Sequence, residues 1–133
     1  MTAPNLLYPK LSRAVIGIYY EVHNELRGGL LEGAYQQATE IALTDAGLRS
    51  RREVPITATI RGHVIEHYRI DLLVEECIIL ECKTSDSLSP HFLTQTRNYL
   101  RVSGHSLGLI LPCGSKAVFQ RVVFDRARTP IQN

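Results

Sequence analysis

At 133 residues the chain has the length of one domain, and it can bury a hydrophobic core without disulfide staples. Hydrophobic residues make up 44% of it and charged residues 21%, and no apolar run approaches the ~20 residues of a membrane span. The net charge of +2 is too small to indicate nucleic-acid binding by itself. The three cysteines lack C-x-x-C spacing, so we expect reduced thiols. The start lacks a secretory-signal pattern, and we expect a cytoplasmic protein.

Two helices are predicted in the first part of the chain. Apolar residues recur at three- and four-residue steps over residues 12–27, which is the pattern of an amphipathic helix that ends at Gly28 and Gly29. A second helix is predicted on the apolar positions of residues 31–42. Gly47 stands where a left-handed helix cap favours glycine.

Three strands are predicted next, and they form an antiparallel meander. Residues 51–60 alternate apolar and polar side chains, and Pro55 confines this run to an edge strand or to a strand start. Arg61 and Gly62 turn the chain, residues 64–74 form the long second strand, and residues 78–83 form the third.

The rest of the chain predicts one helix and two short strands. Ser89 and Pro90 supply an N-cap hydroxyl and a first-turn proline, and Gly104 ends this helix. Residues 107–111 form an apolar strand, and Val118, Val122 and Phe124 belong to a last strand. The predicted order is ααβββαββ, and residues 1–133 form one domain.

Two carboxylates interrupt the second and third strands at Asp71 and Glu81. A loop with an odd number of residues pairs Val74 with Ile78 and therefore places Asp71 beside Glu81, with Lys83 two residues further along the same face. A two-residue loop separates the two acids instead. Because like charges opposite each other destabilise a sheet, their proximity predicts a cation between them.

The two acids have a functional and a structural interpretation. Two carboxylates suit a hard cation such as Mg²⁺, which keeps several waters and takes few protein ligands. Lys83 can then hold or deprotonate an attacking water. The alternative is a solvated face of an antiparallel hairpin, which the spacing favours equally.

Other polar residues fall near these acids in the predicted fold. Gln95 and Tyr99 share a helix face, and so do Glu32 and Tyr35. Arg69 alternates onto the Asp71 face and is a candidate for phosphate contact. The structural alternatives are that Gln95 is solvated, that Tyr99 belongs to the core and that Glu32 only complements the helix dipole.

Together these motifs resemble a known family. Residues 29–35, G-L-L-E-G-A-Y, match the G-x-x-E-x-x-Y signature of the GxxExxY proteins. Asp71, the run E-C-K at residues 81–83 and the run Q-T-R-N-Y at residues 95–99 resemble that family's version of the PD-(D/E)XK nuclease core. The resemblance covers nearly the whole chain, and the order and spacing of the motifs make it specific.

The resemblance implies an α/β fold of the restriction-endonuclease-like type, with a mixed (α+β) sheet flanked by helices. It implies that Asp71 and Glu81 bind Mg²⁺, with Mn²⁺ as a second candidate ion, and that Lys83 assists the attacking water. It further implies that Glu32 is a ligand or contacts one, and that Gln95 and Tyr99 support the site. Ile70 replaces the proline that often precedes the aspartate.

The leading hypothesis is a Mg²⁺-dependent nuclease that hydrolyses phosphodiester bonds in DNA. Arg69, Tyr35 and the cluster of Arg49, Arg51 and Arg52 are the candidates for substrate contact. The alternative is a non-catalytic module on the same fold that binds nucleic acid or protein. We expect no membrane partner, and a homodimer is one candidate assembly.

Overall fold

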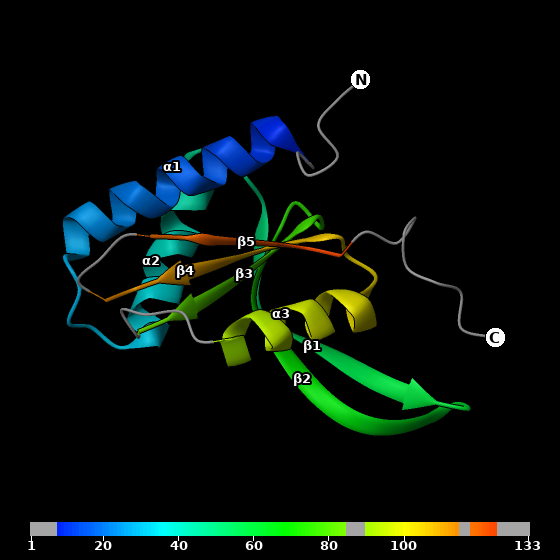
Figure 1. Ribbon diagram of the computed structural model, residues 1–133. Coiled ribbons are helices and arrows are strands. Elements are labelled where there is room, and N and C mark those ends of the chain that lie inside the picture. Colours follow the sequence, from blue (N-terminus) through cyan, green and yellow to red (C-terminus); the bar gives the residue numbers. More distant parts are fainter. Residues whose placement is uncertain (1–7, 85–89, 115–117, 125–133) are drawn as a thin grey trace.

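The protein is built on one five-stranded sheet with helices on both faces (Figure 1). The computed structural model describes residues 8–84, 90–114 and 118–124. The elements follow in the order α1 (Pro9–Leu26), α2 (Glu32–Asp45), β1 (Ser50–Ile60), β2 (His63–Val74), β3 (Ile78–Lys83), α3 (Pro90–Ser103), β4 (Leu107–Pro112) and β5 (Gln120–Val123).

This order confirms the predicted ααβββαββ arrangement and the predicted α/β fold with a mixed sheet. Helix α1 begins at Pro9 rather than at residue 12, because proline is favoured in the first turn of a helix. Strand β5 is shorter than predicted. The predicted helix cap at Ser89 lies outside the described residues. Within the described part of the chain, no helix has the length and apolar character needed to cross a membrane.

The strands lie in the order β1-β2-β3-β4-β5. The β3–β4 pair is parallel and the other three pairs are antiparallel, so the first three strands form the predicted meander. Helix α3 provides the crossover that two consecutive parallel strands require. Pro55 lies in β1, at the edge of the sheet, as its missing N–H predicted.

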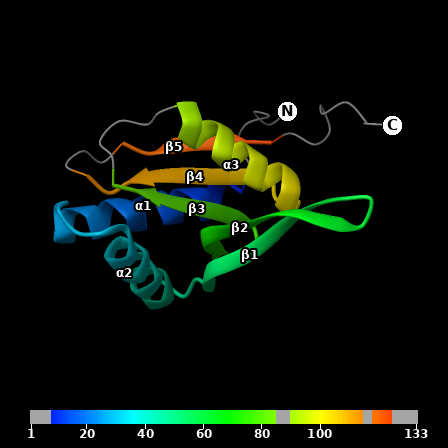
Figure 2. The ribbon, with the colours of Figure 1, turned by 90° about the horizontal axis from the view of Figure 1, so that it is seen from below.

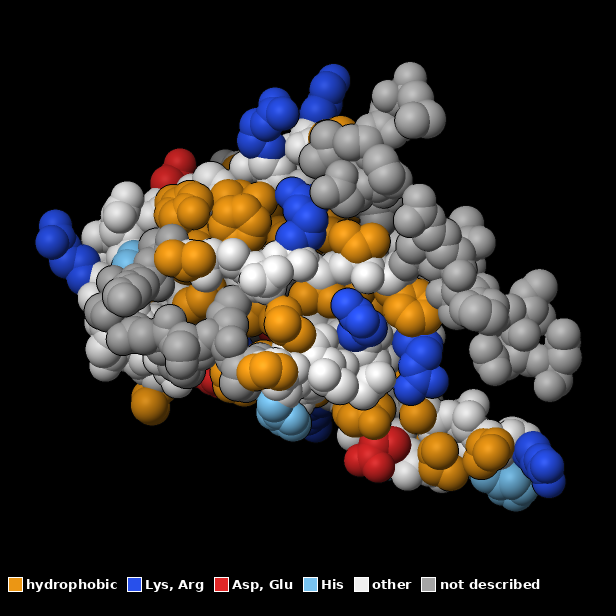
Figure 3. Space-filling view, in the orientation of Figure 1, with side chains coloured by type: hydrophobic (Ala, Val, Ile, Leu, Met, Phe, Trp, Pro, Cys, Tyr) orange, Lys and Arg blue, Asp and Glu red, His pale blue; other side chains and the backbone are white. Residues whose placement is uncertain are grey.

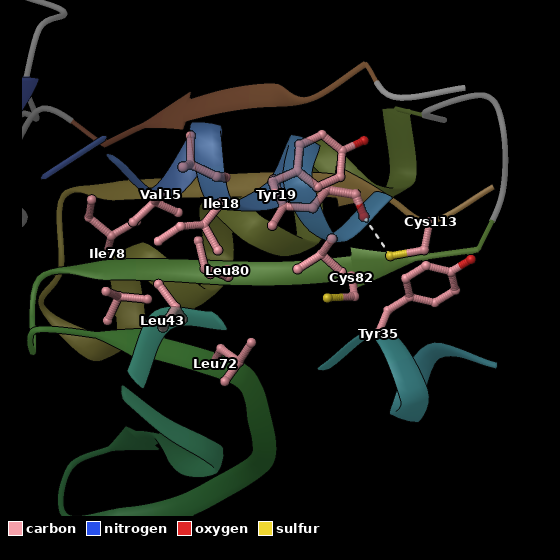
Figure 4. Packing of buried hydrophobic residues seen from close by; sticks show 14 of the residues in the cluster. Val15, Ile18, Tyr19, Tyr35, Leu43, Leu72, Ile78, Leu80, Cys82 and Cys113 are labelled. Atoms are coloured by element: carbon pink, nitrogen blue, oxygen red, sulfur yellow. Dashed lines mark hydrogen bonds between the residues drawn. The ribbon is translucent and has the colours of Figure 1, made fainter. Parts of the chain in front are cut away.

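Each face of the sheet packs one apolar cluster, and Figure 2 shows α3 on one face and α1 and α2 on the other. In Figure 4, Val15, Ile18 and Tyr19 of α1 lie over β3, and Leu43 of α2 packs on the same cluster. The Tyr19 hydroxyl donates a hydrogen bond to the Pro112 carbonyl at 2.7 Å. The opposite cluster, under α3, consists of Val54, Ile70, Leu73, Ile79, Tyr99, Leu100, Ile110 and Val122. All three cysteines are free, as predicted.

Helix α3 packs closely on β4 at Gly108. A Cβ atom at this position would lie 2.8 Å from Cγ2 of Thr96, which is fully buried. Since real Cβ atoms do not approach other carbons this closely, only glycine fits without a shift of the helix. The contact therefore sets the distance between α3 and the sheet. It also sets the position of Gln95, which is next to Thr96.

Strand β2 does not keep the strict alternation that the sequence predicted. Ile70 and Leu73 both pack under α3, whereas Leu72 packs against α1 and α2. The change of face occurs at Asp71, opposite Glu53, which has a φ of 54° and interrupts the pairing with β2. The exchange of faces thus coincides with a local interruption of the ladder, of the kind that bends a strand.

The β1–β2 hairpin extends well beyond the other strands. β1 and β2 pair as far as Ile60 and His63, whereas the β2–β3 ladder covers only residues 72–74 of β2. Residues 55–69 therefore form a two-stranded ribbon, here called the arm, which projects past α3 (Figure 1). The root of the arm lies directly beside Asp71.

Candidate active site

The two predicted acids meet where β2 and β3 separate. The register pairs Val74 with Ile78 and Leu72 with Leu80, which confirms the odd loop and places Asp71 opposite Glu81. The backbone N–H of Asp71 donates to Glu81 Oε2 at 2.9 Å, and the N–H of Cys82 donates to Asp71 Oδ2 at 2.8 Å. Side-chain oxygens thus accept the N–H groups that backbone carbonyls accept in a regular ladder. The β2–β3 pairing therefore ends at Leu72 and Leu80.

This exchange uses one oxygen of each carboxylate. A carboxylate has two oxygens and about four acceptor sites, so Glu81 Oε1 and Asp71 Oδ1 keep acceptor capacity. Glu81 is 1% exposed, and burial together with the Asp71 charge raises its pKa to about 8. Burial also raises the pKa of Asp71, although the Cys82 N–H and the Lys83 charge oppose the shift. Two acids that resist simultaneous ionisation favour a bound cation.

Lys83 lies between the acids and α3. Its Nζ atom is 3.9 Å from Glu81 Oε1 and donates to Gln95 Oε1 at 3.3 Å. It also lies 5.1 Å from the centre of the Phe92 ring, which is within the range of a cation–π contact. The amino group is therefore held in place while its side chain remains 15% exposed.

The structure adds Phe92 to the candidates. Sequence reasoning had assigned it no role at the site. Its position three residues before Gln95 puts both side chains on the helix face toward Lys83, and this i,i+3 relation was the available signal.

Tyr99 and Glu32 approach the acids from opposite faces of the sheet. Tyr99 is buried against the Tyr68 ring at 5.2 Å between centroids. Burial, followed by the charges of Glu81 and Asp71, raises the Tyr99 pKa to about 12. Glu32, in the first turn of α2, lies near enough for its charge to raise the pKa values of both acids.

Of the two predicted substrate contacts, Tyr35 is placed differently from expectation and Arg69 is not. Tyr35 is 2% exposed, and its ring lies in the core beside Cys82 and Cys113 (Figure 4), so it offers no surface to a substrate. Arg69 is exposed in the arm, at the β2 position two residues before Asp71.

The basic cluster predicted to approach nucleic acid is neutralised by acids. Its pairs are Arg49–Glu75 at 3.2 Å, Arg51–Glu76 at 2.7 Å and Arg52–Glu40 at 3.3 Å. Glu75 and Glu76 occupy the β2–β3 turn, and no sequence pattern indicated that they face the arginines. With three arginines matched by three glutamates, the cluster adds no net charge for a phosphate backbone.

The donor set fits a hard divalent cation. Asp71 and Glu81 supply two anionic oxygens, and Mg²⁺ and Mn²⁺ accept oxygen ligands, with Mg²⁺ retaining several waters. Among the described residues, no three acidic, histidine or cysteine side chains form a ready-made metal site, so Glu32 stands near the pair without joining it. A site of two carboxylates completed by water and substrate agrees with this arrangement.

Comparison with known proteins adds a family to this geometry. Residues 9–122 match the family model described as the PD-(D/E)XK nuclease superfamily. The chain belongs to this superfamily.

A solved structure shares the fold. The chain resembles the protein of "Crystal structure of SSO0001" with a TM-score of 0.55 and 20% sequence identity. The similarity covers 71% of this chain and 52% of that chain, so the match spans about half the length of the solved protein. At this identity the likeness concerns the fold alone, which is the restriction-endonuclease-like fold of the PD-(D/E)XK nuclease superfamily. No curated protein matches the sequence.

Proposed function

We propose that the protein is a Mg²⁺-dependent nuclease that hydrolyses phosphodiester bonds in DNA, and that Mn²⁺ can replace Mg²⁺. The main support is the paired arrangement of Asp71 and Glu81, in which each acid accepts a backbone N–H from the opposite strand. This arrangement holds two mutually repelling carboxylates in place before any cation binds. The superfamily supports the same class of reaction.

Asp71 and Glu81 hold the cation through the oxygens that the backbone does not use. When bound, the ion supplies Lewis-acid activation of water and of the phosphate. Lys83 orients the attacking water or stabilises charge at the scissile phosphate, because its amino group is fixed next to Glu81. Gln95 holds Lys83, and Phe92 shields one side of it.

The remaining residues have supporting roles. Glu32 adds negative charge near the cation, either as a ligand or through a water. Tyr99 forms the buried wall beneath the acids, and Arg69 contacts the phosphate backbone. The resemblance to the GxxExxY proteins belongs to this proposal, with Glu32 and Tyr35 as its signature positions and Tyr35 in a packing role.

Purified protein incubated with DNA and RNA substrates tests the proposal. We expect cleavage of DNA with Mg²⁺ or Mn²⁺ and none with EDTA. Asp71→Asn and Glu81→Gln should abolish both cleavage and metal binding measured by calorimetry, because each removes one of two anionic ligands. The matched control is Glu25→Gln, which removes an exposed glutamate of α1 and should leave activity unchanged.

Two results would contradict the nuclease proposal. Cleavage that persists in both variants would show that the acids are structural. Nucleic-acid binding without cleavage under any divalent ion would favour the non-catalytic module.

A further inference from the structure

Among the described residues, the arm packs on the rest of the protein only through Ile56 and Tyr68, which contact the cluster under α3. Apart from half-buried Ile56, Ala58 and Tyr68, its residues 55–69 are all exposed. A two-stranded hairpin is marginally stable by itself in water. An exposed ribbon that starts beside Asp71 therefore suggests a surface that contacts the substrate.

The two faces of the arm differ in chemistry. Ile56 and Tyr68 are partners and pack toward α3, and a hollow of about 420 Å³ between arm and helix is lined by Glu66 and Arg101, among others. By the two-residue period, Arg69 and His67 point to the opposite face. That face has no acidic residue between its root and the turn at Arg61.

The basic residues of the arm are free to bind a ligand. Among the described residues, neither Arg61 nor Arg69 forms an ion pair, in contrast to Arg49, Arg51 and Arg52. Arg61 lies in the turn at the end of the ribbon, with a φ of 50°, and is exposed. Within the described part of the chain, the arm therefore carries two arginines without an acidic partner, one at its root and one at its tip.

The tip combines this charge with exposed apolar side chains. Ile60, Val64 and Ile65 are 56%, 51% and 61% exposed, and Figure 3 shows apolar and basic side chains together at the projecting end. A second copy docking tip to tip would bring like charges together. A ligand that is a polyanion and carries apolar groups in a groove matches both the positive charge and the exposed apolar side chains of the tip.

We propose that the arm lies in the major groove of double-stranded DNA next to the cleaved bond. The groove of B-form DNA is about 12 Å wide and admits a two-stranded ribbon, whereas the deep, narrow groove of A-form RNA does not. Arg69 and Arg61 contact phosphates at the root and tip of the arm, and the apolar tip contacts thymine methyl groups. This inference rests on the proposed function, and it specifies the substrate as duplex DNA.

The length of the arm gives the reach of the contact. Eight residue steps separate Asp71 from His63, which corresponds to ~26 Å of strand. At 3.4 Å per base pair, this spans ~8 base pairs on one side of the cleavage site.

The test measures binding of the full chain in EDTA, so that cleavage plays no part. The probes are a DNA duplex, an RNA duplex of the same sequence and the single DNA strand, each over a series of salt concentrations. We expect the DNA duplex to bind tightest. In Arg61→Gln/Arg69→Gln, the slope of log affinity against log salt should shrink by about 1 for each arginine.

The control variant is Lys10→Gln/Arg13→Gln, which removes two exposed charges from α1 near β5, at the other edge of the sheet. It should change the slope less than the arm variant does. Wild-type protein should also protect guanine N7, in the major groove, from dimethyl sulfate over ~8 base pairs on one side, and the arm variant should not.

The outcomes separate this inference from the proposed function. Equal salt slopes for the arm and control variants would overturn the inference even if the protein cuts DNA. So would an affinity for the RNA duplex or for the single strand that equals the affinity for the DNA duplex. Self-association that disappears in Ile60→Ser/Ile65→Ser would instead assign the arm to a second copy. Arm-dependent duplex binding without cleavage would support the inference and contradict the nuclease proposal.

Discussion

Lys83 is held by three different contacts, and this distinguishes it from an ordinary surface lysine. Its amino group meets a carboxylate, an amide oxygen and an aromatic face, contributed by Glu81, Gln95 and Phe92. A long flexible side chain loses considerable rotamer entropy in such a position. The position therefore serves a purpose beyond the weak attraction of a partly exposed ion pair.

The role of Lys83 can be separated from metal binding. Lys83→Met should reduce the cleavage rate by about 10²-fold or more, because it removes the group that orients water or stabilises charge at the phosphate. Metal affinity measured by calorimetry should stay the same or rise slightly, since a competing positive charge is lost. Lys83→Arg should not restore the rate fully, because a planar guanidinium does not replace a compact ammonium. Wild-type rates in Lys83→Met would make the lysine a bystander.

The raised pKa of Glu81 predicts how stability depends on pH without metal. The pKa is 4.5 for a free glutamate and about 8 in the folded protein. Between these values the native state keeps a proton that the unfolded chain releases, so stability falls as pH rises through this window. The shift of Asp71 acts in the same direction.

The melting temperature in EDTA should therefore decrease between pH about 5 and about 8. Glu81→Gln should remove most of this decrease, while Glu25→Gln should retain it. Added Mg²⁺ should raise the melting temperature most at the alkaline end, where it replaces the proton. A melting temperature that rises with pH in wild type would show that Glu81 is already charged.

At the scale of single residues, the sequence predicted the positions that depend on local rules. Asp71, Glu81 and Lys83 follow from the period of a strand and the length of one loop. Tyr35 was predicted to contact substrate but lies in the core. Helix periodicity predicts which face a residue occupies and does not predict how deeply it is buried. The arginines at positions 49, 51 and 52 were misjudged because their acidic partners lie elsewhere in the chain, two in the β2–β3 turn and one in α2.

Among the elements, α3 determines how the site is assembled, because it places Gln95 and Phe92 over Lys83. Its height depends on the contact between Gly108 and Thr96. Gly108→Ala should displace the helix, since the new Cβ meets Thr96 Cγ2 at 2.8 Å. Overpacking of this kind typically costs about 1–3 kcal/mol, measurable by urea unfolding.

Thr96→Ser provides the matched compensation for this change. It removes Cγ2 and keeps the hydroxyl, so Gly108→Ala combined with Thr96→Ser should regain most of the lost stability and activity. A double-mutant cycle measures the coupling. If the two single effects simply add, the close approach does not control the position of α3.

Element boundaries were predictable wherever a turn residue marked them, and strand β3 matches its prediction at both ends. The change of face in β2 was not predictable. It coincides with an interruption of the β1–β2 pairing at Glu53, a non-glycine residue with positive φ, and neither strand shows it in its own pattern.

At the scale of the whole molecule, stability should be distributed unevenly. Strands β3 and β4 are buried on both faces, whereas the arm exposes most of its side chains. Amides of β3 and β4 should therefore exchange hydrogen most slowly, and those of residues 55–69 fastest among the strands, as measured by mass spectrometry or NMR. Duplex DNA should slow exchange in the arm. Uniform exchange across the sheet would mean that the arm has a packing partner.

The fold as a whole was predictable because helix and strand periods change clearly along the chain. That residues 1–133 form one domain remains a prediction. The projection of the arm was not foreseen, because strand length does not reveal where neighbouring strands end.

The gap between β2 and β3 also bears on how this chain can diverge over evolution. Asp71 and Glu81 stand where two apolar residues could extend the ladder and enlarge the core. Under the proposed function, this loss of stability in favour of activity is of a kind common at functional sites. A descendant relieved of that function gains stability by losing both acids together, since losing one leaves a backbone N–H of the opposite strand without its acceptor. Inactive descendants should therefore have an apolar pair at these positions, a longer β2–β3 ladder and a higher melting temperature.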